Sequence, residues 1–196
     1  LNGRGNILLI KLNYLIMKNL LIVIITLCAF SMQAQSVKNT SYISRTGEKV
    51  LRLEATLPVD LAEAWKLFTT DDKLKLWIAP LAHIELKTGG YILTNYDTTK
   101  SLTDNTAIRL DIVNYIDMEQ LTLKVNLNDK FPGNVKNEDE NLQEIIQLKY
   151  ISPNETKIIS SMVGWGKGKD WEKSYEFFVL GNIYTYEEML KLFNKQ

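Results

Sequence analysis

The chain has 196 residues, of which 45% are hydrophobic, 10% aromatic and 23% charged, a composition typical of a folded globular protein. It has 23 Lys and Arg residues and 23 Asp and Glu residues, so its formal net charge is zero. This balance argues against a nucleic-acid-binding protein, because binding to a polyanion needs a basic excess. With one Cys and one His, the chain excludes a disulfide scaffold and a zinc site made of its own Cys and His side chains.

The first part of the chain has the features of a secretory signal peptide. Lys18 follows the first Met and supplies the basic end, residues 20–30 form an uncharged apolar run, and Ala34 is a small residue suited to cleavage. The apolar run is shorter than the roughly 20 residues that a bilayer span needs. An uncleaved N-terminal anchor is the alternative. We interpret residues 1–16 as an upstream extension, 17–34 as the signal peptide and 35–196 as a single exported domain without a membrane span.

The exported domain is expected to be mildly acidic and free of cysteine. Removal of residues 1–34 takes away Arg4, Lys11, Lys18 and the only cysteine, Cys28, and leaves 162 residues with a formal net charge of −3. A domain of this size buries roughly 70% of its unfolded surface, so its hydrophobic core can hold it together without disulfides.

Alternation of apolar and polar residues predicts an antiparallel sheet with one buried face. In residues 49–57, for example, Leu51, Leu53 and Leu57 share one face, whereas Arg52 lies on the other. Short turns at 46–47 and 87–90 join neighbouring strands. The expected strands are residues 41–44, 49–57, 82–86, 91–96, 108–112, 121–127, 146–150 and 156–163.

Two short helices are expected after the second of these strands. Asp60 is a candidate N-cap. It precedes apolar residues at positions i, i+3, i+4 and i+7, a spacing typical of an amphipathic helix. A second short helix is expected over residues 70–77, with Thr70 as its cap. The apolar residues of the first helix are Leu61, Ala64, Trp65 and Phe68.

The chain ends with a long amphipathic helix in this interpretation. Asp170 is the expected cap, and the helix is expected to run to about Asn194, because large apolar residues recur at helical spacing. These residues are Trp171, Tyr175, Phe178, Ile183, Tyr186, Met189 and Phe193. The element order predicts an α+β helix-grip fold, in which a curved antiparallel sheet wraps around the C-terminal helix.

Four segments resemble the SRPBCC (START-like) superfamily, and within it the group named after the C-terminal domain of the activator of heat-shock-protein-90 ATPase. They are P-V-D-L-A-E-A-W-K-L-F-T-T from Pro58, L-K-L-W-I-A-P ending at Pro80, K-T-G-G-Y-I-L from Lys87, and T-K-I-I-S-S-M-V-G-W-G leading into K-D-W-E-K-S-Y-E-F-F. The resemblance covers roughly residues 45–194 and implies a helix-grip fold with an apolar cavity between sheet and C-terminal helix. The polar stretch 128–141 does not align with the group and is expected to be a variable loop. The chaperone partner is cytosolic, whereas this chain is expected to be exported, so the name of the group does not define its function.

Two features that suggest catalysis have simpler interpretations. The glycine-rich stretch 164–168 lacks the Ser or Thr that follows the lysine of a phosphate-binding loop, and it is interpreted as a turn into the last helix. His83 is expected to share a strand face with Glu85, opposite Ala82 and Ile84, as a solvated or hydrogen-bonded residue. No pair of carboxylates has the spacing of an acid and a base.

The aromatic residues are the best indication of a binding site. We assign Trp65 and Trp171 to the core, because large rings commonly fill it. Other rings are candidates for the lining of an apolar cavity, to which two residues on strands are expected to add polar atoms. The candidate ligand-binding residues are Trp77, Tyr96, Asn114, Ser160, Tyr175 and Phe178.

The sequence therefore predicts an exported, non-catalytic protein that binds a small hydrophobic molecule, with no catalytic residue, metal or cofactor assigned. One alternative is a module that binds other proteins through its surface, which would have a filled core. The other is a START-like hydrolase or cyclase, which would need a titratable group inside the cavity. His83 is the only candidate for that group that titrates near neutral pH.

Overall fold

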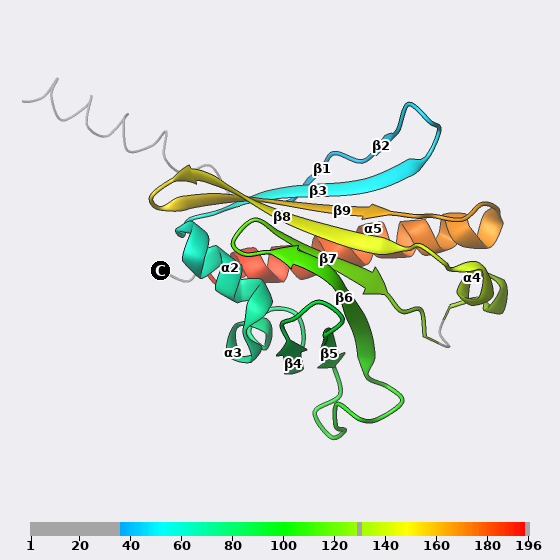
Figure 1. Ribbon diagram of the computed structural model, residues 1–196, viewed down its shortest axis with the longest axis horizontal. Coiled ribbons are helices and arrows are strands. Elements are labelled where there is room, and N and C mark those ends of the chain that lie inside the picture. The colour runs from blue at the N-terminus through cyan, green and yellow to red at the C-terminus, as the bar shows by residue number, and fades with distance from the viewer. Residues whose placement is uncertain (1–35, 129–130, 195–196) are drawn as a thin grey trace, which may run out of the picture. The chain divides into compact units, whose positions relative to one another are not determined.

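The computed structural model describes residues 36–128 and 131–194, and the predicted upstream extension and signal peptide lie outside this range. The described residues form an antiparallel sheet of nine strands with a long C-terminal helix (Figure 1). The strands are β1 (Lys38–Asn39), β2 (Tyr42–Ile43), β3 (Lys49–Leu57), β4 (Leu81–Glu85), β5 (Tyr91–Asn95), β6 (Ile108–Ile116), β7 (Gln120–Val125), β8 (Gln143–Ser152) and β9 (Glu155–Val163). The helices are α2 (Leu61–Thr69), α3 (Asp71–Leu74), α4 (Gly133–Glu138) and α5 (Lys169–Lys191).

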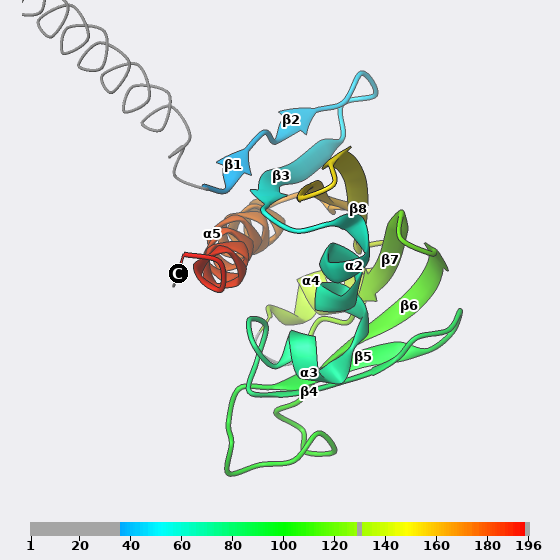
Figure 2. The same ribbon diagram turned by 90° about the vertical axis from the view of Figure 1, so that its left-hand side faces the viewer.

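The order of the strands places the first long strand beside the last. Strands β4 to β9 pair with their neighbours in sequence, and β3 pairs with β9 from Leu51 opposite Met162 to Leu57 opposite Thr156. The sheet follows a curve from β3 to β4, and α5 lies on its hollow side (Figure 2). This arrangement confirms the predicted α+β helix-grip fold.

Helix α2 forms as the sequence predicts. The Asp60 side chain accepts a hydrogen bond from the backbone N–H of Glu63 at 2.8 Å, which is the expected N-cap contact. Helix α3 is shorter than the predicted segment, and Thr70 is its N-cap residue, as predicted. The Thr70 side chain makes no cap hydrogen bond to α3, because its hydroxyl donates back to the carbonyl of Lys66 at 3.0 Å.

Helix α5 begins and ends earlier than predicted. Its N-cap is Gly168 and its first residue is Lys169, so Asp170 lies inside the first turn and is not the cap. A carboxylate is still favourable there, because it faces the positive end of the helix dipole. The helix ends at Lys191, before the predicted Asn194.

The polar stretch 128–141 is not simply a loop, which corrects the expectation from the sequence. It contains α4, whose Val135 is fully buried and packs in the core. Glu138 at the end of α4 accepts a hydrogen bond from Nε1 of Trp171 at 2.9 Å, which ties this segment to the first turn of α5. A single buried apolar residue creates no periodic pattern, so the sequence does not reveal this helix.

The hydrophobic core lies between the sheet and its helices. Trp65 and Trp171 are 7% and 2% exposed and belong to this core, as predicted. The glycine-rich stretch forms the turn into α5, also as predicted. Within residues 36–128 and 131–194, no helix is both long and apolar enough to cross a bilayer.

Candidate ligand-binding cavity

A cavity of about 700 Å³ lies between the sheet and α5. From the sheet, its wall is formed by apolar side chains such as Ile92 on β5, Leu110 on β6 and Leu123 on β7. The α5 side of the cavity carries several short residues. Ser174, Gly181, Asn182 and Thr185 line it at helical spacing and leave space that larger side chains would fill. The cavity therefore follows from the sequence of α5 as well as from the curvature of the sheet.

Aromatic residues on the protein surface also border the cavity. Tyr96 follows β5, and Phe177 and Tyr184 belong to α5. All three line the cavity although they are 60–63% exposed. The cavity thus reaches the protein surface between α5 and the segment after β5.

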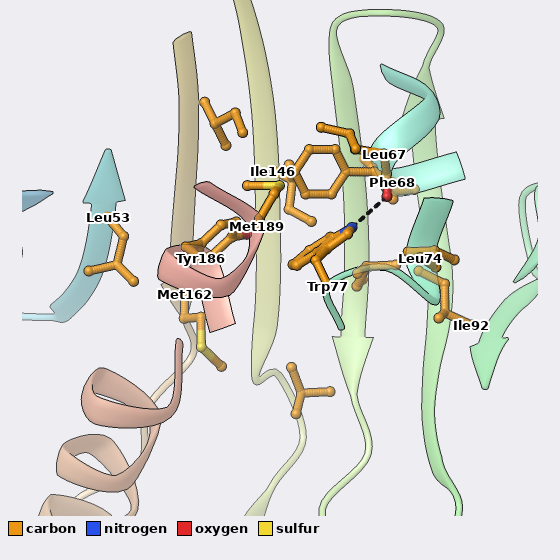
Figure 3. Packing of buried hydrophobic residues seen from close by; sticks show 14 of the residues in the cluster. Leu53, Leu67, Phe68, Leu74, Trp77, Ile92, Ile146, Met162, Tyr186 and Met189 are labelled. Atoms are coloured by element: carbon orange, nitrogen blue, oxygen red, sulfur yellow. Dashed lines mark hydrogen bonds between the residues drawn. The ribbon is translucent and has the colours of Figure 1, made fainter. Parts of the chain in front are cut away.

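Trp77 and Tyr186 form a stacked pair that also lines the cavity. Their ring centroids are 5.8 Å apart, with an angle of 27° between the ring planes. Nε1 of Trp77 donates a hydrogen bond to the carbonyl of Leu67 at 2.9 Å, the dashed line in Figure 3. This bond satisfies one of the last carbonyls of α2, which have no partner inside the helix.

Glu144 is a carboxylic acid among the apolar lining residues. It lies on β8 opposite Leu123 on one side and Met162 on the other, both of which are buried. Its Oε1 accepts a hydrogen bond from Oγ of Ser160 at 2.6 Å and another from the hydroxyl of Tyr186 at 3.0 Å. Among the described residues, no hydrogen bond reaches Oε2, and no basic side chain forms an ion pair with this carboxyl group.

The surroundings of Glu144 favour its neutral form. Burial raises the pKa of Glu144 above its usual value, although the hydrogen bonds from Ser160 and Tyr186 oppose the rise. The pKa of Tyr186 is raised well above its usual value by burial and, after that, by the neighbouring Glu144 charge. Both groups are therefore neutral over a wider range of pH than they would be in water.

Three of the six predicted ligand-binding residues line the cavity, namely Trp77, Tyr96 and Phe178. Ser160 does not line the cavity. It donates a hydrogen bond to Glu144, which does. Tyr175 lies elsewhere on α5, where its ring packs against Trp165 at 5.0 Å between centroids.

Asn114 lies outside the cavity, which corrects its predicted position. The sequence pattern places it on the same face as Ile112, because both occupy alternate positions of one strand. The pairing of β6 with β7 shifts between Ile112 and Asn114, at an irregularity of the β-bulge kind. Ile112 stays buried, whereas Asn114 is exposed. An extra residue in one strand reverses the face of the residues after it, and alternation alone does not reveal it.

Glu144 is absent from the residues predicted from the sequence, although a signal for it exists. The predicted strand begins at Ile146, with Leu148 on the same face. Two further steps of the same alternation reach Glu144 and Leu142 on the buried face. A glutamate at such a position marks a carboxyl group on the core-facing side of the sheet.

His83 has a structural role, as predicted. It lies on β4, where Nδ1 is 2.8 Å from Oδ2 of Asp71, and it does not line the cavity. The other oxygen of Asp71 accepts the backbone N–H of Ile84 at 2.8 Å. Among residues 36–128 and 131–194, no three His, Cys, Asp or Glu side chains are grouped as a metal site would require.

Comparison with known proteins identifies the fold but not the activity. No protein-family model and no curated protein matches the sequence. Protein Ms6760 from Mycobacterium smegmatis is 11% identical with a TM-score of 0.59, over 82% of this chain and 98% of that protein. Protein MLL2253 from Mesorhizobium loti is 13% identical with a TM-score of 0.58, over 75% of this chain and 98% of that protein.

An Aha1 dimer from Colwellia psychrerythraea is also similar, with 14% identity and a TM-score of 0.49 over 69% of this chain and 92% of that protein. At these identities the likeness concerns the fold alone. The two proteins with TM-scores of 0.58 and 0.59 share the helix-grip fold that the sequence predicts.

Proposed function

We propose that this protein binds a small, largely apolar molecule in the cavity between the sheet and α5. The observation that carries this proposal is the cavity of about 700 Å³ and its apolar, aromatic lining. Pockets for small ligands commonly measure about 300–1,000 Å³, with mostly apolar walls and a few polar groups. Protein interiors are otherwise close-packed, with few voids larger than a water molecule. A void of this size is therefore better explained by a ligand than by imperfect packing.

The cavity also separates this proposal from the alternative of a surface interaction module. That alternative predicts a filled core, whereas the inner face of α5 leaves a large space opposite β5, β6 and β7. The core is well packed at Trp65 and Trp171 but not between these strands and α5. The observed cavity supports the binding protein over the interaction module.

An enzyme of the START-like hydrolase or cyclase kind is the second candidate, and Glu144 is the observation that favours it. A neutral carboxylic acid inside a cavity is suited to general acid catalysis. The hydroxyls of Ser174 and Thr185 line the cavity, but they donate to the carbonyls of Asp170 and Gly181 in their own helix. Neither is bonded to a base that would activate it as a nucleophile. We therefore favour binding without catalysis.

We also propose that the protein acts outside the cytoplasm. This proposal depends on the signal-peptide features of residues 17–34, which lie outside the described residues. Fractionation of cells that produce the full chain, followed by mass analysis of its N-terminus, tests it. A protein that begins at residue 35 in the exported fraction is the expected result, and an uncleaved cytoplasmic protein would contradict it.

Binding is tested with N-phenylnaphthylamine, a neutral fluorescent probe, and with a variant whose cavity is filled. Gly181 lines the cavity, and a Cβ atom added there would meet no other atom within 4 Å. Gly181→Phe should therefore fold but weaken probe binding by about tenfold or more. Leu180→Phe is the matched control, because Leu180 is 71% exposed and does not line the cavity.

The proposal is supported if the wild-type domain and Leu180→Phe bind the probe equally and Gly181→Phe does not. It is contradicted if the wild-type domain does not bind the probe, or if all three proteins bind it alike. Extraction and mass analysis of molecules that co-purify with residues 35–196 would then show the class of the natural ligand.

A further inference from the structure

We propose that the ligand carries an uncharged acceptor oxygen, such as that of a ketone or an ester, and that the Glu144 carboxyl group donates a hydrogen bond to it from Oε2. This inference rests on the proposed function, because it names the polar group by which the cavity would select its ligand. It assigns Glu144 as the residue that determines specificity within an otherwise apolar cavity.

The hydrogen bonds around Glu144 favour Oε2 as the oxygen that holds the proton of the neutral acid. Oε1 accepts hydrogen bonds from both Ser160 and Tyr186, so its lone pairs are occupied. A protonated carboxyl group has one O–H donor, and the oxygen that accepts two donors is not the one that carries it. We therefore place the proton on Oε2, the oxygen that no described residue contacts by a hydrogen bond, on a side chain that lines the cavity.

Among the described residues, the partners of Glu144 carry no positive charge that would keep it ionised. Its partners on β7 and β9 are Leu123 and Met162, and Ser160 is also uncharged. On α5 the titratable group that faces it is the Tyr186 hydroxyl, which is itself buried. Burial raises the pKa of Glu144 accordingly.

Lys173, the one basic residue among the described residues of the cavity lining, lies far from this carboxyl group. Lys173 is 13 residues before Tyr186 on α5, which corresponds to about 20 Å along the helix axis. Its ammonium group is 3.5 Å from the carboxylate of Asp170 in the first turn of the helix. It therefore does not stabilise the charged form of Glu144.

A neutral acceptor fits this site better than an ammonium group does. Binding an amine would require an ionised Glu144, and both charges would have to leave water for an apolar cavity, which is costly. A ketone or ester oxygen needs only the neutral acid, and an O–H donor left without an acceptor in the cavity would be unfavourable. A ligand that lacks the oxygen would leave this O–H donor without an acceptor, and so it should bind more weakly.

The test uses three probes with the same skeleton: a naphthyl methyl ketone, the corresponding ethylnaphthalene and the corresponding naphthylethylamine. Binding of each is measured by calorimetry to the wild-type domain, Glu144→Leu and Glu144→Gln. The ketone should bind Glu144→Leu about tenfold more weakly than wild type, whereas ethylnaphthalene should bind it at least as well. Glu144→Gln should restore binding of the ketone, because its amide N–H can donate in place of the acid.

Two further measurements separate a direct hydrogen bond from a structural effect. The infrared carbonyl stretch of the bound ketone should move to lower frequency in wild type and Glu144→Gln, but not in Glu144→Leu. The affinity of the wild type for the ketone should fall as rising pH ionises Glu144, whereas its affinity for ethylnaphthalene and the affinity of Glu144→Gln for the ketone should not change.

The possible failures are distinguishable. If neither the ketone nor ethylnaphthalene binds the wild type, the proposed function itself is wrong. If both bind, but replacement of Glu144 by Leu does not affect the ketone, the cavity binds ligands without the assigned hydrogen bond and the inference is overturned. Tightest binding of the naphthylethylamine, with an affinity that rises with pH, would overturn it in favour of an ionised Glu144 and a cationic ligand.

Discussion

The indole of Trp77 stacks on the phenol ring of Tyr186 with 5.8 Å between ring centroids. This contact joins the segment after α3 to the C-terminal half of α5, and both residues are labelled in Figure 3. Because Trp77 also donates a hydrogen bond to Leu67, one side chain connects α2 and α5. Because Tyr186 donates a hydrogen bond to Glu144, the same pair connects these helices to β8. The ring stack thus holds together the elements that surround the cavity.

Trp77→Phe should lower the free energy of unfolding by about 1–3 kcal/mol. The phenyl ring can still contact Tyr186, but the carbonyl of Leu67 loses its donor in a buried place. Urea denaturation of the domain measures the change. Phe68→Leu serves for comparison, since it disturbs the ring that contacts Trp77 edge-on at 5.3 Å without removing a hydrogen bond. A Trp77→Phe domain as stable as wild type would show that water replaces the indole as donor.

Two Gly→Ala substitutions should have effects of opposite sign. At Gly181, inside α5, an added Cβ meets no atom within 4 Å, so the higher helix propensity of alanine should stabilise the domain by about 0.5–1 kcal/mol. At Gly166, an added Cβ would lie 2.2 Å from Nε1 of Trp171, a side chain that is 2% exposed. The indole would have to move away from Glu138, which should destabilise the domain by about 1–3 kcal/mol.

Melting temperatures of the two alanine variants check this contrast. The chemical change is the same at both positions, so effects of equal sign would contradict the packing described for Gly166 or the open space beside Gly181. Gly181 also lines the cavity, but one methyl group is too small to fill it. Gly181→Ala should therefore change stability without blocking the cavity.

Strong periodic patterns predict most of the fold. Alternation over residues 49–57 indicates β3 with the bounds that the structure has, and the helical spacing of Trp171, Tyr186 and Met189 identifies α5. These residues reveal their elements because each one faces the core at a regular interval. Val135 in α4 has no such neighbours, and so this helix escapes prediction.

Only part of the candidate site is predictable from the sequence. The errors occur where strand register, or the side of the helix that a residue occupies, decides whether the residue faces the cavity. Trp77 and Phe178 line the cavity as expected. Asn114 does not, because the irregularity in β6 turns it to the other face of the sheet. Tyr175 occupies another side of α5, where it contacts Trp165. Glu144 depends on where β8 begins, and the strand predicted from the sequence starts only after it, at Ile146. Strand ends and bulges depend on pairing with neighbouring strands, which one sequence pattern does not contain.

Asp71→Asn should reduce stability at about pH 6, and the reduction should shrink as pH falls through the folded pKa of Asp71. Burial alone would raise the pKa of Asp71, but the hydrogen bonds from His83 and Ile84 outweigh it and lower the pKa below its usual value. The folded state therefore releases this proton more readily than the unfolded state. The stability that Asp71 contributes is present above its ordinary pKa of 3.8 and is lost as pH falls through the folded pKa. Urea denaturation of wild type and Asp71→Asn at a series of pH values from about 6 downward measures the difference in their unfolding free energies. A difference that does not change with pH would contradict the lowered pKa of Asp71.

Glu144→Gln should show the opposite dependence on pH. Burial raises the pKa of Glu144 above its ordinary value of 4.5, so the folded state holds the proton more tightly than the unfolded state. Any stability from the neutral acid is complete below that ordinary pKa and is lost as pH rises through the folded pKa. Glutamine cannot ionise, and its amide oxygen can accept the hydrogen bonds from Ser160 and Tyr186.

The wild-type domain should therefore lose stability relative to Glu144→Gln as pH increases above about 4.5, and the two should differ least in acid. Urea denaturation at a series of pH values gives the difference in unfolding free energy directly. The Asp71→Asn variant is the internal control, because its difference from wild type should grow over the acidic range in which Glu144 is still protonated. A Glu144→Gln difference that is independent of pH, or that favours wild type at high pH, would mean that Glu144 is already ionised in the folded protein. The carboxyl group would then be an acceptor and not a donor in the cavity.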